Sequence, residues 1–164
     1  MKEIKHKKAE KQYIRRADEK DFGRIAEIYV FNNRMEYFPV FGNVPFSFGE
    51  LQVLSYVEQL KETAAEIFVY DDGVIKGFVL VKEQEIDKLH IESFFQGQGI
   101  GALLLRHAIE ACGAKYLWVL EKNTRALGFY QSQGLNTTKE KEILYGPEGK
   151  TEWMVKMTVK DRGL

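Results

Sequence analysis

The hydrophobic positions in the first third of the chain predict one short strand, after which they repeat at the spacing of a helix. Residues 13–15 (Tyr-Ile-Arg) predict the strand, and Asp18 follows as a helix N-cap. Apolar side chains then recur three and four residues apart, at Phe22, Ile25, Ala26, Ile28 and Tyr29. A second helix is predicted to begin near Ser47, where Glu50 completes a capping box. The apolar side of this helix carries Leu51, Leu54, Val57 and Leu60.

Strand-like runs fill the middle of the chain. Asp72-Gly73 separates two runs rich in β-branched and aromatic residues, 65–71 and 74–81, and this pattern predicts a β-hairpin. A third strand is predicted from Ile86 to Ser93, where a glycine-rich loop begins. The apolar segment after that loop predicts a helix from Gly99 to Ala111.

The last fifty residues continue with a strand from Tyr116 to Glu121 and a helix that opens near Asn123 and stops at Gly134. A closing hairpin is predicted from strand residues 142–145, a turn at 146–149 and a strand with alternating Trp153, Val155, Met157 and Val159. The whole order predicts an α+β domain around a mixed, mostly antiparallel sheet flanked by helices.

Composition favours one folded domain. The chain has 164 residues, of which 45% are hydrophobic, and it lacks an apolar run of membrane-spanning length. Lysine and arginine balance aspartate and glutamate at 24 each, so we expect neither nucleic acid nor a membrane as partner. The basic residues 1–11 are expected to form a flexible tail before a domain spanning 12–164. The lone Cys112 allows no internal disulfide or cysteine-based zinc site, which suits the cytoplasm, and we expect no metal.

Aromatic residues crowd the segment 32–48, which also holds two of the three prolines. We predict a loop here, and its aromatic content is too apolar for an idle surface loop. Two interpretations stay open. The loop packs onto the core, or it forms one wall of a ligand pocket from Tyr37, Phe38, Phe41 and Phe46.

Three alternating glycines, Gly97, Gly99 and Gly101, lie where a predicted strand meets a predicted helix. A helix start with free N–H groups and no nearby carboxylate can hold a phosphate or pyrophosphate. The segment also fits the dinucleotide pattern G-x-G-x-x-G/A, and Glu121 falls near the distance of a ribose-binding acid. That pattern belongs at the first crossover of a parallel sheet, whereas hairpins precede it here.

Residues 96–101 also match the pattern Q/R-x-x-G-x-G/A, and here the chain resembles the GCN5-related N-acetyltransferase (GNAT) family. A second stretch, LWVLEKNTRALGFYQSQGL, resembles that family's fifth strand and following helix. The matching positions are Asn123, Ala126, Phe129, Tyr130, Gly134 and Leu135, of which Leu135 departs from the usual aromatic residue. The resemblance runs from Tyr13 to Met157 and implies a single-domain GNAT-like fold with a splayed central strand pair.

The resemblance implies that acetyl-coenzyme A (acetyl-CoA) is the acetyl donor. The residues expected to bind it are Gln96, Gly97, Gln98, Gly99, Ile100, Gly101, Ala102, Asn123 and Tyr130. A cleft between the strands at 86–93 and 116–121 would take the pantetheine arm, and backbone groups of Ile91, Glu92 and Ser93 would polarise the thioester carbonyl.

Acetyl transfer to an amine also needs a proton for the departing thiolate and a base for the amine. Tyr130 fits the acid, since a phenol can protonate a thiolate and the family resemblance points to the same tyrosine. Glu85 matches the family's base best, with Glu92, Asp87, His90 or a chain of water molecules as alternatives.

The acceptor is expected to be a small, partly apolar primary amine rather than a peptide. Glu36, Tyr37, Phe38 and Phe41 are its predicted binding residues, with Glu36 suited to an ammonium group. Two other functions stay open: a non-catalytic coenzyme A binding module and a dinucleotide-dependent oxidoreductase. A homodimer is also open.

Overall fold

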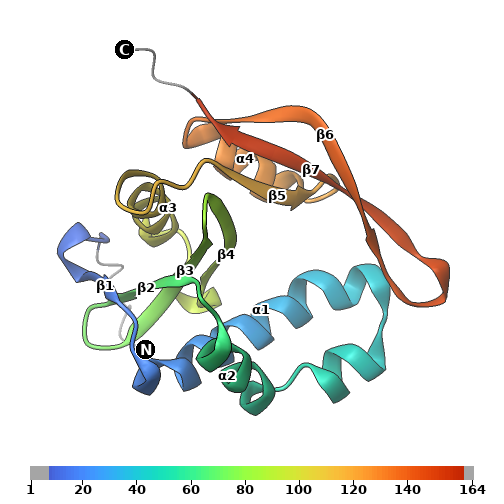
Figure 1. The fold of residues 1–164 in the computed structure, drawn as a ribbon, viewed down its shortest axis with the longest axis horizontal. Helices are drawn as coiled ribbons and strands as arrows, with labels where there is room; N and C mark the ends of the chain where they lie inside the picture. Colours follow the sequence, from blue (N-terminus) through green and yellow to red (C-terminus); the bar gives the residue numbers. More distant parts are fainter. Residues whose placement is uncertain (1–7, 161–164) are drawn as a thin grey trace, which may run out of the picture.

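A seven-stranded sheet forms the centre of this computed structural model, which describes residues 8–160 (Figure 1). The strand order is β1-β2-β3-β4-β5-β7-β6, and each neighbouring pair is antiparallel except the parallel pair β4–β5. The strands are β1 Ile14–Arg16, β2 Glu66–Asp71, β3 Ile75–Lys82, β4 Glu85–Ile91, β5 Tyr116–Leu120, β6 Leu135–Tyr145 and β7 Thr151–Val159. The predicted α+β class with a mixed, mostly antiparallel sheet is confirmed.

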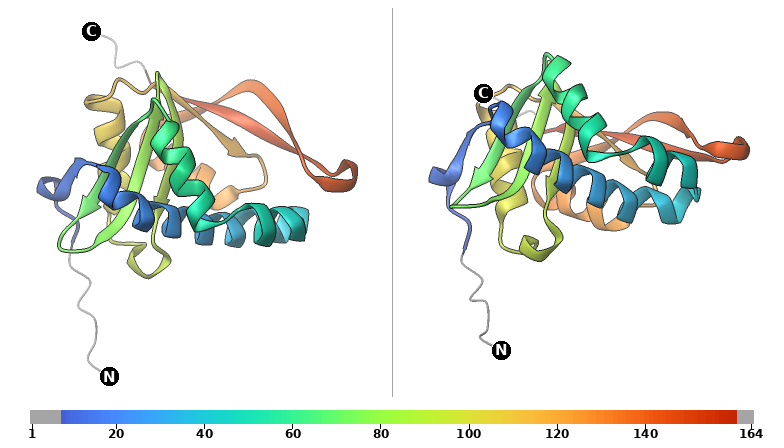
Figure 2. Two further views of the ribbon diagram at one scale, coloured as in Figure 1. Left: turned by 60° about the horizontal axis from the view of Figure 1, so that its bottom comes forward. Right: turned by 90° about the horizontal axis from the view of Figure 1, so that it is seen from below.

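Helices cover both faces of the sheet (Figure 2). The α-helices are α1 Phe22–Phe41, α2 Val53–Glu62, α3 Ile100–Glu110 and α4 Thr124–Ser132. Four short 3₁₀-helices are described, η1 Lys11–Tyr13, η2 Glu19–Asp21, η4 Ser93–Phe95 and η5 Pro147–Gly149, and η3 Pro45–Glu50 is a π-helix.

Alternation along β3 builds a separate core on each face. Phe78 and Leu80 pack with α1 and α2, whereas Val79 and Val81 pack with α3. This follows from strand geometry, because successive side chains point to opposite faces. A strand that is apolar on both faces must be covered on both, so the apolar run of β3 fixes the sheet between two helical layers.

The sheet opens between β4 and β5. These strands share one register pair, Glu85↔Tyr116, after which the two halves of the sheet diverge (Figure 1). An irregularity lies at this place in β4: Leu80 pairs with Lys88 and Val81 with Ile86, which leaves Asp87 as an extra residue. A bulge bends its strand and can end pairing. The predicted splayed strand pair is therefore confirmed.

The predicted loop at 32–48 is wrong over most of its length. Helix α1 continues through Pro39 to Phe41, and η3 follows. Pro39 has no N–H to donate to the carbonyl four residues earlier, and the helix extends only two residues beyond it. The helix then ends at Gly42, whose left-handed backbone (φ +61°) lets its N–H donate to the Phe38 carbonyl at 2.8 Å.

The predicted start of the second helix at Ser47 is also wrong. Ser47 is buried in η3, and α2 begins at Val53. Gln52 is its N-cap, and the Gln52 N–H donates to Ser55 Oγ at 3.2 Å. Glu50 therefore takes no part in a capping box.

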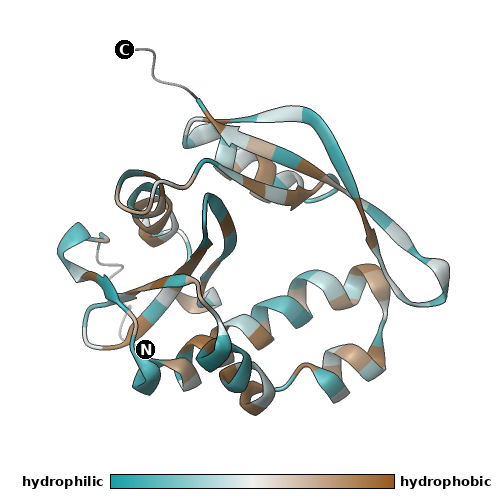
Figure 3. Cartoon of the chain, in the orientation of Figure 1, coloured by the Kyte–Doolittle hydropathy of each residue, from teal (hydrophilic) through white to brown (hydrophobic). Residues whose placement is uncertain are grey.

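Strand β6 is longer than the predicted 142–145, since it begins at Leu135 directly after α4. Its register runs from Leu135↔Val159 to Tyr145↔Thr151, with an irregularity between Thr137 and Lys141. The first part of β6 is coloured hydrophilic in Figure 3. Charged residues are common on an edge strand exposed to solvent, and they hide the strand from a search for apolar alternation.

The N-terminal segment joins the fold earlier than the predicted boundary at residue 11. Residues 1–7 of the expected tail lie outside the described residues. The Ala9 N–H donates to the Gln98 carbonyl at 3.1 Å, and the Glu10 N–H donates to the Tyr70 hydroxyl at 3.1 Å. The chain next to the glycine loop is thus held by hydrogen bonds from Ala9 onward.

Candidate active site

A cavity of about 850 Å³ lies where β4 and β5 diverge. Its walls come from α1, β4, the glycine loop, the first turn of α3, β5 and α4, with Glu152 of β7 at one side. The predicted coenzyme residues Ile91, Gln96, Gly97, Gly99, Ile100, Gly101, Ala102, Asn123 and Tyr130 line it, as do Glu36 and Tyr37. The topology thus brings most of the predicted site to one place.

The glycine loop has the backbone that its sequence suggests. Gly97 and Gly99 adopt φ of +78° and +89°, a region that residues with a Cβ avoid. Gly99 is the N-cap of α3, which has no side-chain cap and no acidic residue in its first turn. The first N–H groups of α3 thus meet the cavity without a competing carboxylate, a local arrangement suited to an anion. Gln98 lies outside the cavity lining.

The backbone N–H and C=O groups of successive β4 residues point alternately toward β3 and toward the opening between β4 and β5. The Glu92 N–H donates to the Lys76 carbonyl at 2.8 Å, so Glu92 belongs to the residues bonded to β3. Because bonding direction alternates along an antiparallel pair, the N–H groups of Leu89 and Ile91 point toward β5. Of the three predicted backbone donors, Ile91 is the one on the cavity; Glu92 and Ser93 are outside its lining.

Two side chains hold the Ile91 carbonyl. Asn32 Nδ2 donates to it at 3.0 Å from α1, and Gln96 Nε2 donates at 3.2 Å from the loop. Arg125 of α4 donates in turn to Gln96 Oε1 at 3.0 Å. A continuous hydrogen-bonded chain therefore connects α1, β4, the loop and α4 around the cavity. Sequence reasoning gave Asn32 and Arg125 no role. Asn32 stands in no motif, and Arg125 lies between the matched positions Asn123 and Ala126 of the second GNAT-like stretch without being one of them.

Tyr130 faces the cavity from α4. Burial, together with the charge of Glu36 and the neighbouring Tyr37, raises the pKa of Tyr130 above its ordinary value of 10. The phenol therefore keeps its proton at neutral pH. Asn123 both lines the cavity and caps α4, since its Oδ1 accepts from the Ala126 N–H at 3.1 Å.

The structure places Glu85 away from these groups. It stands at the start of β4, opposite Tyr116, where the two strands are still paired, and it is outside the cavity lining. Burial and the charges of Asp87 and Glu142 raise its pKa. No contact connects Glu85 with Tyr130 among the described residues. The reason is topological, because β4 and β5 diverge only after this position.

The alternatives to Glu85 have other partners. Asp87 Oδ2 accepts from Lys88 Nζ at 2.8 Å, and Glu92 pairs with Arg24 at 2.9 Å. His90 lines the cavity, but burial lowers its pKa to about 4, so the ring is neutral at pH 7.

The predicted acceptor wall divides into two parts. Glu36 and Tyr37 line the cavity, whereas Phe38 and Phe41 do not. Phe38 packs edge-on against Phe48 at a centroid distance of 5.0 Å, and Phe41 stacks on Tyr37 at 6.5 Å. The predicted role of Phe38 and Phe41 is corrected accordingly. Phe38 turns to another face of α1, and Phe41, one turn beyond Tyr37, packs on the Tyr37 ring outside the cavity lining.

A model of the family described as "Acetyltransferase (GNAT) family" matches residues 28–135. The chain belongs to the GNAT family. A protein named peptidyl-lysine N-acetyltransferase YjaB from Salmonella typhimurium is 34% identical over 84 residues, which cover 51% of this chain and 58% of that protein. The Escherichia coli protein of the same name is 34% identical over 67 residues, 41% of this chain and 46% of that one. The chain thus spans about half the length of the curated relatives it matches.

Solved structures show the same fold for this GNAT chain. The apo-form of YjaB from Escherichia coli superposes with a TM-score of 0.68 at 22% identity, covering 88% of this chain and 95% of that one. The structure of yncA from Salmonella typhimurium with its cofactor acetyl-CoA has a TM-score of 0.62 at 19% identity and covers 92% and 94%.

The topology also decides against the dinucleotide alternative. The glycine loop follows the fourth strand of a sheet whose first four strands are antiparallel, so it is not the first crossover of a parallel sheet. Among the described residues, no group of three or more His, Cys, Asp or Glu side chains could hold a metal ion. No helix within residues 8–160 is long and apolar enough to cross a membrane.

Proposed function

We propose that this protein transfers the acetyl group of acetyl-CoA to a primary amine by direct attack of the amine. The observation that carries the proposal is the position of the glycine loop. Gly97, Gly99 and the uncapped start of α3 meet a cavity that also contains Tyr130. A phosphate-binding helix start and a protonated phenol in one cleft match the two ends of a coenzyme A thioester.

The residues on the cavity fit this coenzyme. Backbone N–H groups of the loop and the first turn of α3 would bind its pyrophosphate. The N–H groups of Leu89 and Ile91, which point toward the opening, would bind the pantetheine amides and the thioester carbonyl. When bound, acetyl-CoA supplies a thioester whose carbonyl carbon accepts the amine.

Tyr130 would give its proton to the sulfur of the leaving group. Its raised pKa means that the phenol is fully protonated at neutral pH, as a general acid requires. Tyr130 lines the cavity, so its hydroxyl would face the sulfur of a thioester bound there.

The acceptor we propose first is a small primary amine, in line with the sequence. The solved-structure neighbours do not favour one acceptor over another. A second candidate, the side chain of a peptide lysine, is favoured by the name of the two YjaB relatives. Both candidates present an ammonium group on an apolar stem.

Two measurements test the proposal. Calorimetry with acetyl-CoA and with NADH is expected to give micromolar binding of acetyl-CoA only, and Gly99→Glu is expected to abolish it by placing a carboxylate at the start of α3. Thiol release is then followed with tyramine, n-butylamine and an N-terminally blocked peptide with one lysine. Tyr130→Phe is expected to lower kcat about 100-fold or more with acetyl-CoA binding retained.

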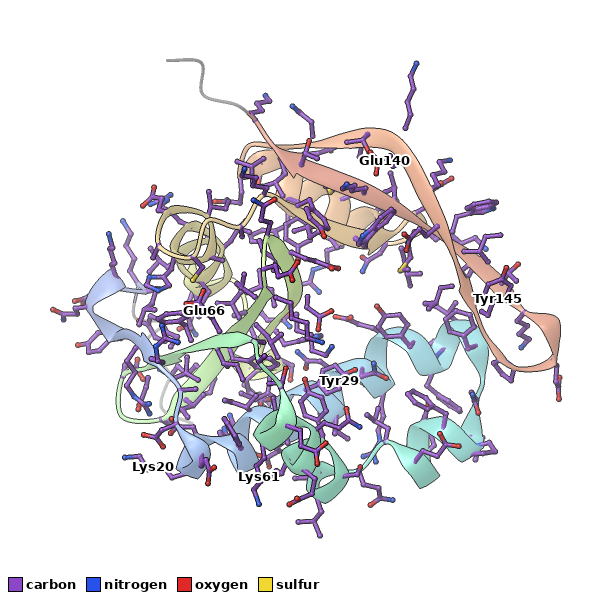
Figure 4. The ribbon with its side chains drawn as sticks, in the orientation of Figure 1. Lys20, Tyr29, Lys61, Glu66, Glu140 and Tyr145 are labelled. Atoms are coloured by element: carbon purple, nitrogen blue, oxygen red, sulfur yellow. The ribbon has the colours of Figure 1, made fainter. Side chains whose placement is uncertain are left out.

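Tyr145→Phe is the matched control, because Tyr145 is 76% exposed at the end of β6, where the β6–β7 hairpin turns (Figure 4). Binding of acetyl-CoA without turnover of any amine would support the non-catalytic module instead. No binding of acetyl-CoA would refute the proposal as a whole.

A further inference from the structure

One charged side chain on the cavity has no partner. Asp87 pairs with Lys88 at 2.8 Å, Glu152 with Lys122 at 3.1 Å, and Arg125 donates to Gln96 at 3.0 Å. Glu36 lines the same cavity and makes no hydrogen bond or ion pair with any other residue between 8 and 160. A carboxylate in this position is open to a ligand of opposite charge.

The position of Glu36 is set by helix α1. Asn32, Glu36 and Val40, which follow one another at intervals of four residues, all line the cavity, with Tyr37 beside them. This spacing places them on one face of the helix. The continuation of α1 through Pro39 is what carries this face along the cavity.

The opposite wall contains Tyr130, and the two groups are near enough to affect one another. Burial is the larger cause of the raised pKa of Tyr130 and of Tyr37, and the charge of Glu36 raises both pKa values further. Partial desolvation by the surrounding cavity raises the pKa of Glu36 itself, an effect that the charge of Arg125 opposes. The side chain is still exposed to solvent, so an ammonium group that enters the cavity can reach the carboxylate and is attracted by its charge.

We infer that Glu36 binds the ammonium group of the acceptor and takes up the proton that the amine must lose before it attacks. This inference rests on the proposed function, which it deepens by assigning the group on the acceptor side of the cleft. It replaces Glu85, which lies outside the cavity, and it uses a residue on a helix rather than on β4.

The protons balance as follows. The acceptor gives one proton from its ammonium nitrogen to the Glu36 carboxylate, which later releases it to solvent. The neutral amine forms the new C–N bond, and the C–S bond breaks as Tyr130 protonates the sulfur. The second proton leaves the nitrogen and restores the phenol of Tyr130. The net products are the N-acetylated amine, the coenzyme A thiol and one proton.

The inference predicts a specific loss in Glu36→Gln, which keeps the size of the side chain and removes its charge. The assay compares tyramine, whose amine is an ammonium at pH 7, with hydroxylamine, which is uncharged there. We expect kcat/KM for tyramine to fall about 10- to 100-fold, as for a lost hydrogen bond to a charged group. The value for hydroxylamine should change less than about threefold, and the KM for acetyl-CoA should stay the same.

Glu27→Gln is the control, because Glu27 lies on the same helix, is exposed and pairs with Arg24 away from the cavity. Equal activity of Glu36→Gln and Glu27→Gln with tyramine would overturn the inference. Equal losses with tyramine and hydroxylamine would also overturn it, because they would indicate a structural role. If the unmodified protein binds acetyl-CoA but acetylates no amine, the proposed function itself fails, which is a different result from either.

Discussion

Acidification is expected to destabilise the protein through His90. The ring is packed between Tyr29, at a centroid distance of 5.4 Å, and Phe78, at 5.7 Å. Asn32 Nδ2 lies 3.5 Å from its Nδ1. Burial and the charge of Lys88 lower its pKa from 6.5 to about 4, although the charge of Asp87 acts in the other direction. The folded protein therefore keeps His90 neutral where the unfolded chain would protonate it.

The sign and the size follow from this difference. Above the unfolded pKa of 6.5 neither state binds the proton, and the stability is unaffected. As the pH falls from 6.5 toward 4, the unfolded chain gains a proton that the folded protein excludes, so the free energy of unfolding decreases. The loss between pH 7 and pH 4.5 amounts to about 2 kcal/mol, since one pKa unit corresponds to about 1.4 kcal/mol.

Urea unfolding of the wild-type protein and of His90→Asn, measured at several pH values between about 7 and 4.5, tests this prediction. Other groups titrate in the same range, but they do so in both proteins and cancel in the difference. We expect the stability of the wild type relative to the variant to decrease by about 2 kcal/mol on acidification. A difference that stays constant with pH would refute the reasoning.

Three further changes have expected outcomes. Arg15→Met leaves the buried Asp21 carboxylate without its 2.7 Å partner and should cost about 2 kcal/mol in urea unfolding, a difference that should shrink as acid protonates Asp21. Gly77→Ala places a Cβ about 2.9 Å from the His90 carbonyl, so it should displace β4 and weaken acetyl-CoA binding in calorimetry. Phe78→Ala removes a fully buried ring and should cost about 3–5 kcal/mol, measured by thermal unfolding.

Much of the fold follows from local patterns in the sequence. The hairpin of β2 and β3 has its Asp-Gly turn, and α3 and α4 begin at the glycine loop and at Asn123, as predicted. The glycine loop was predictable because its backbone adopts positive φ angles, which glycine allows and residues with a side chain rarely adopt. These signals act within about ten residues and do not depend on the rest of the chain.

The errors arose where distant packing outweighs local preference. Pro39 and the aromatic residues around it suggested a loop, but the helix continues past Pro39 to Phe41, which stacks on Tyr37 one turn earlier. The first part of β6 is polar since it forms the edge of the sheet, and pairing with β7 keeps it extended.

The site was predictable only in part for a related reason. Motif residues identified the coenzyme side of the cavity, whereas the acceptor side depends on where α1 and β4 lie. In the sequence, nothing distinguishes Glu36 from Glu85 as a cavity residue. In the structure, Glu85 lies where β4 and β5 are still paired, whereas Glu36 lines the cavity that opens beyond that point.

The single register pair between β4 and β5 has a consequence for stability. Most sheets satisfy their backbone groups with the next strand, but here the N–H groups of Leu89 and Ile91 that point toward β5 meet a cavity instead, while the Ile91 carbonyl is held by Asn32 and Gln96. A bound pantetheine chain, with its own amides, would occupy the place of the absent strand contacts. The substrate would then join two half-sheets and act as a temporary part of the fold, so that binding and mechanical rigidity rise together.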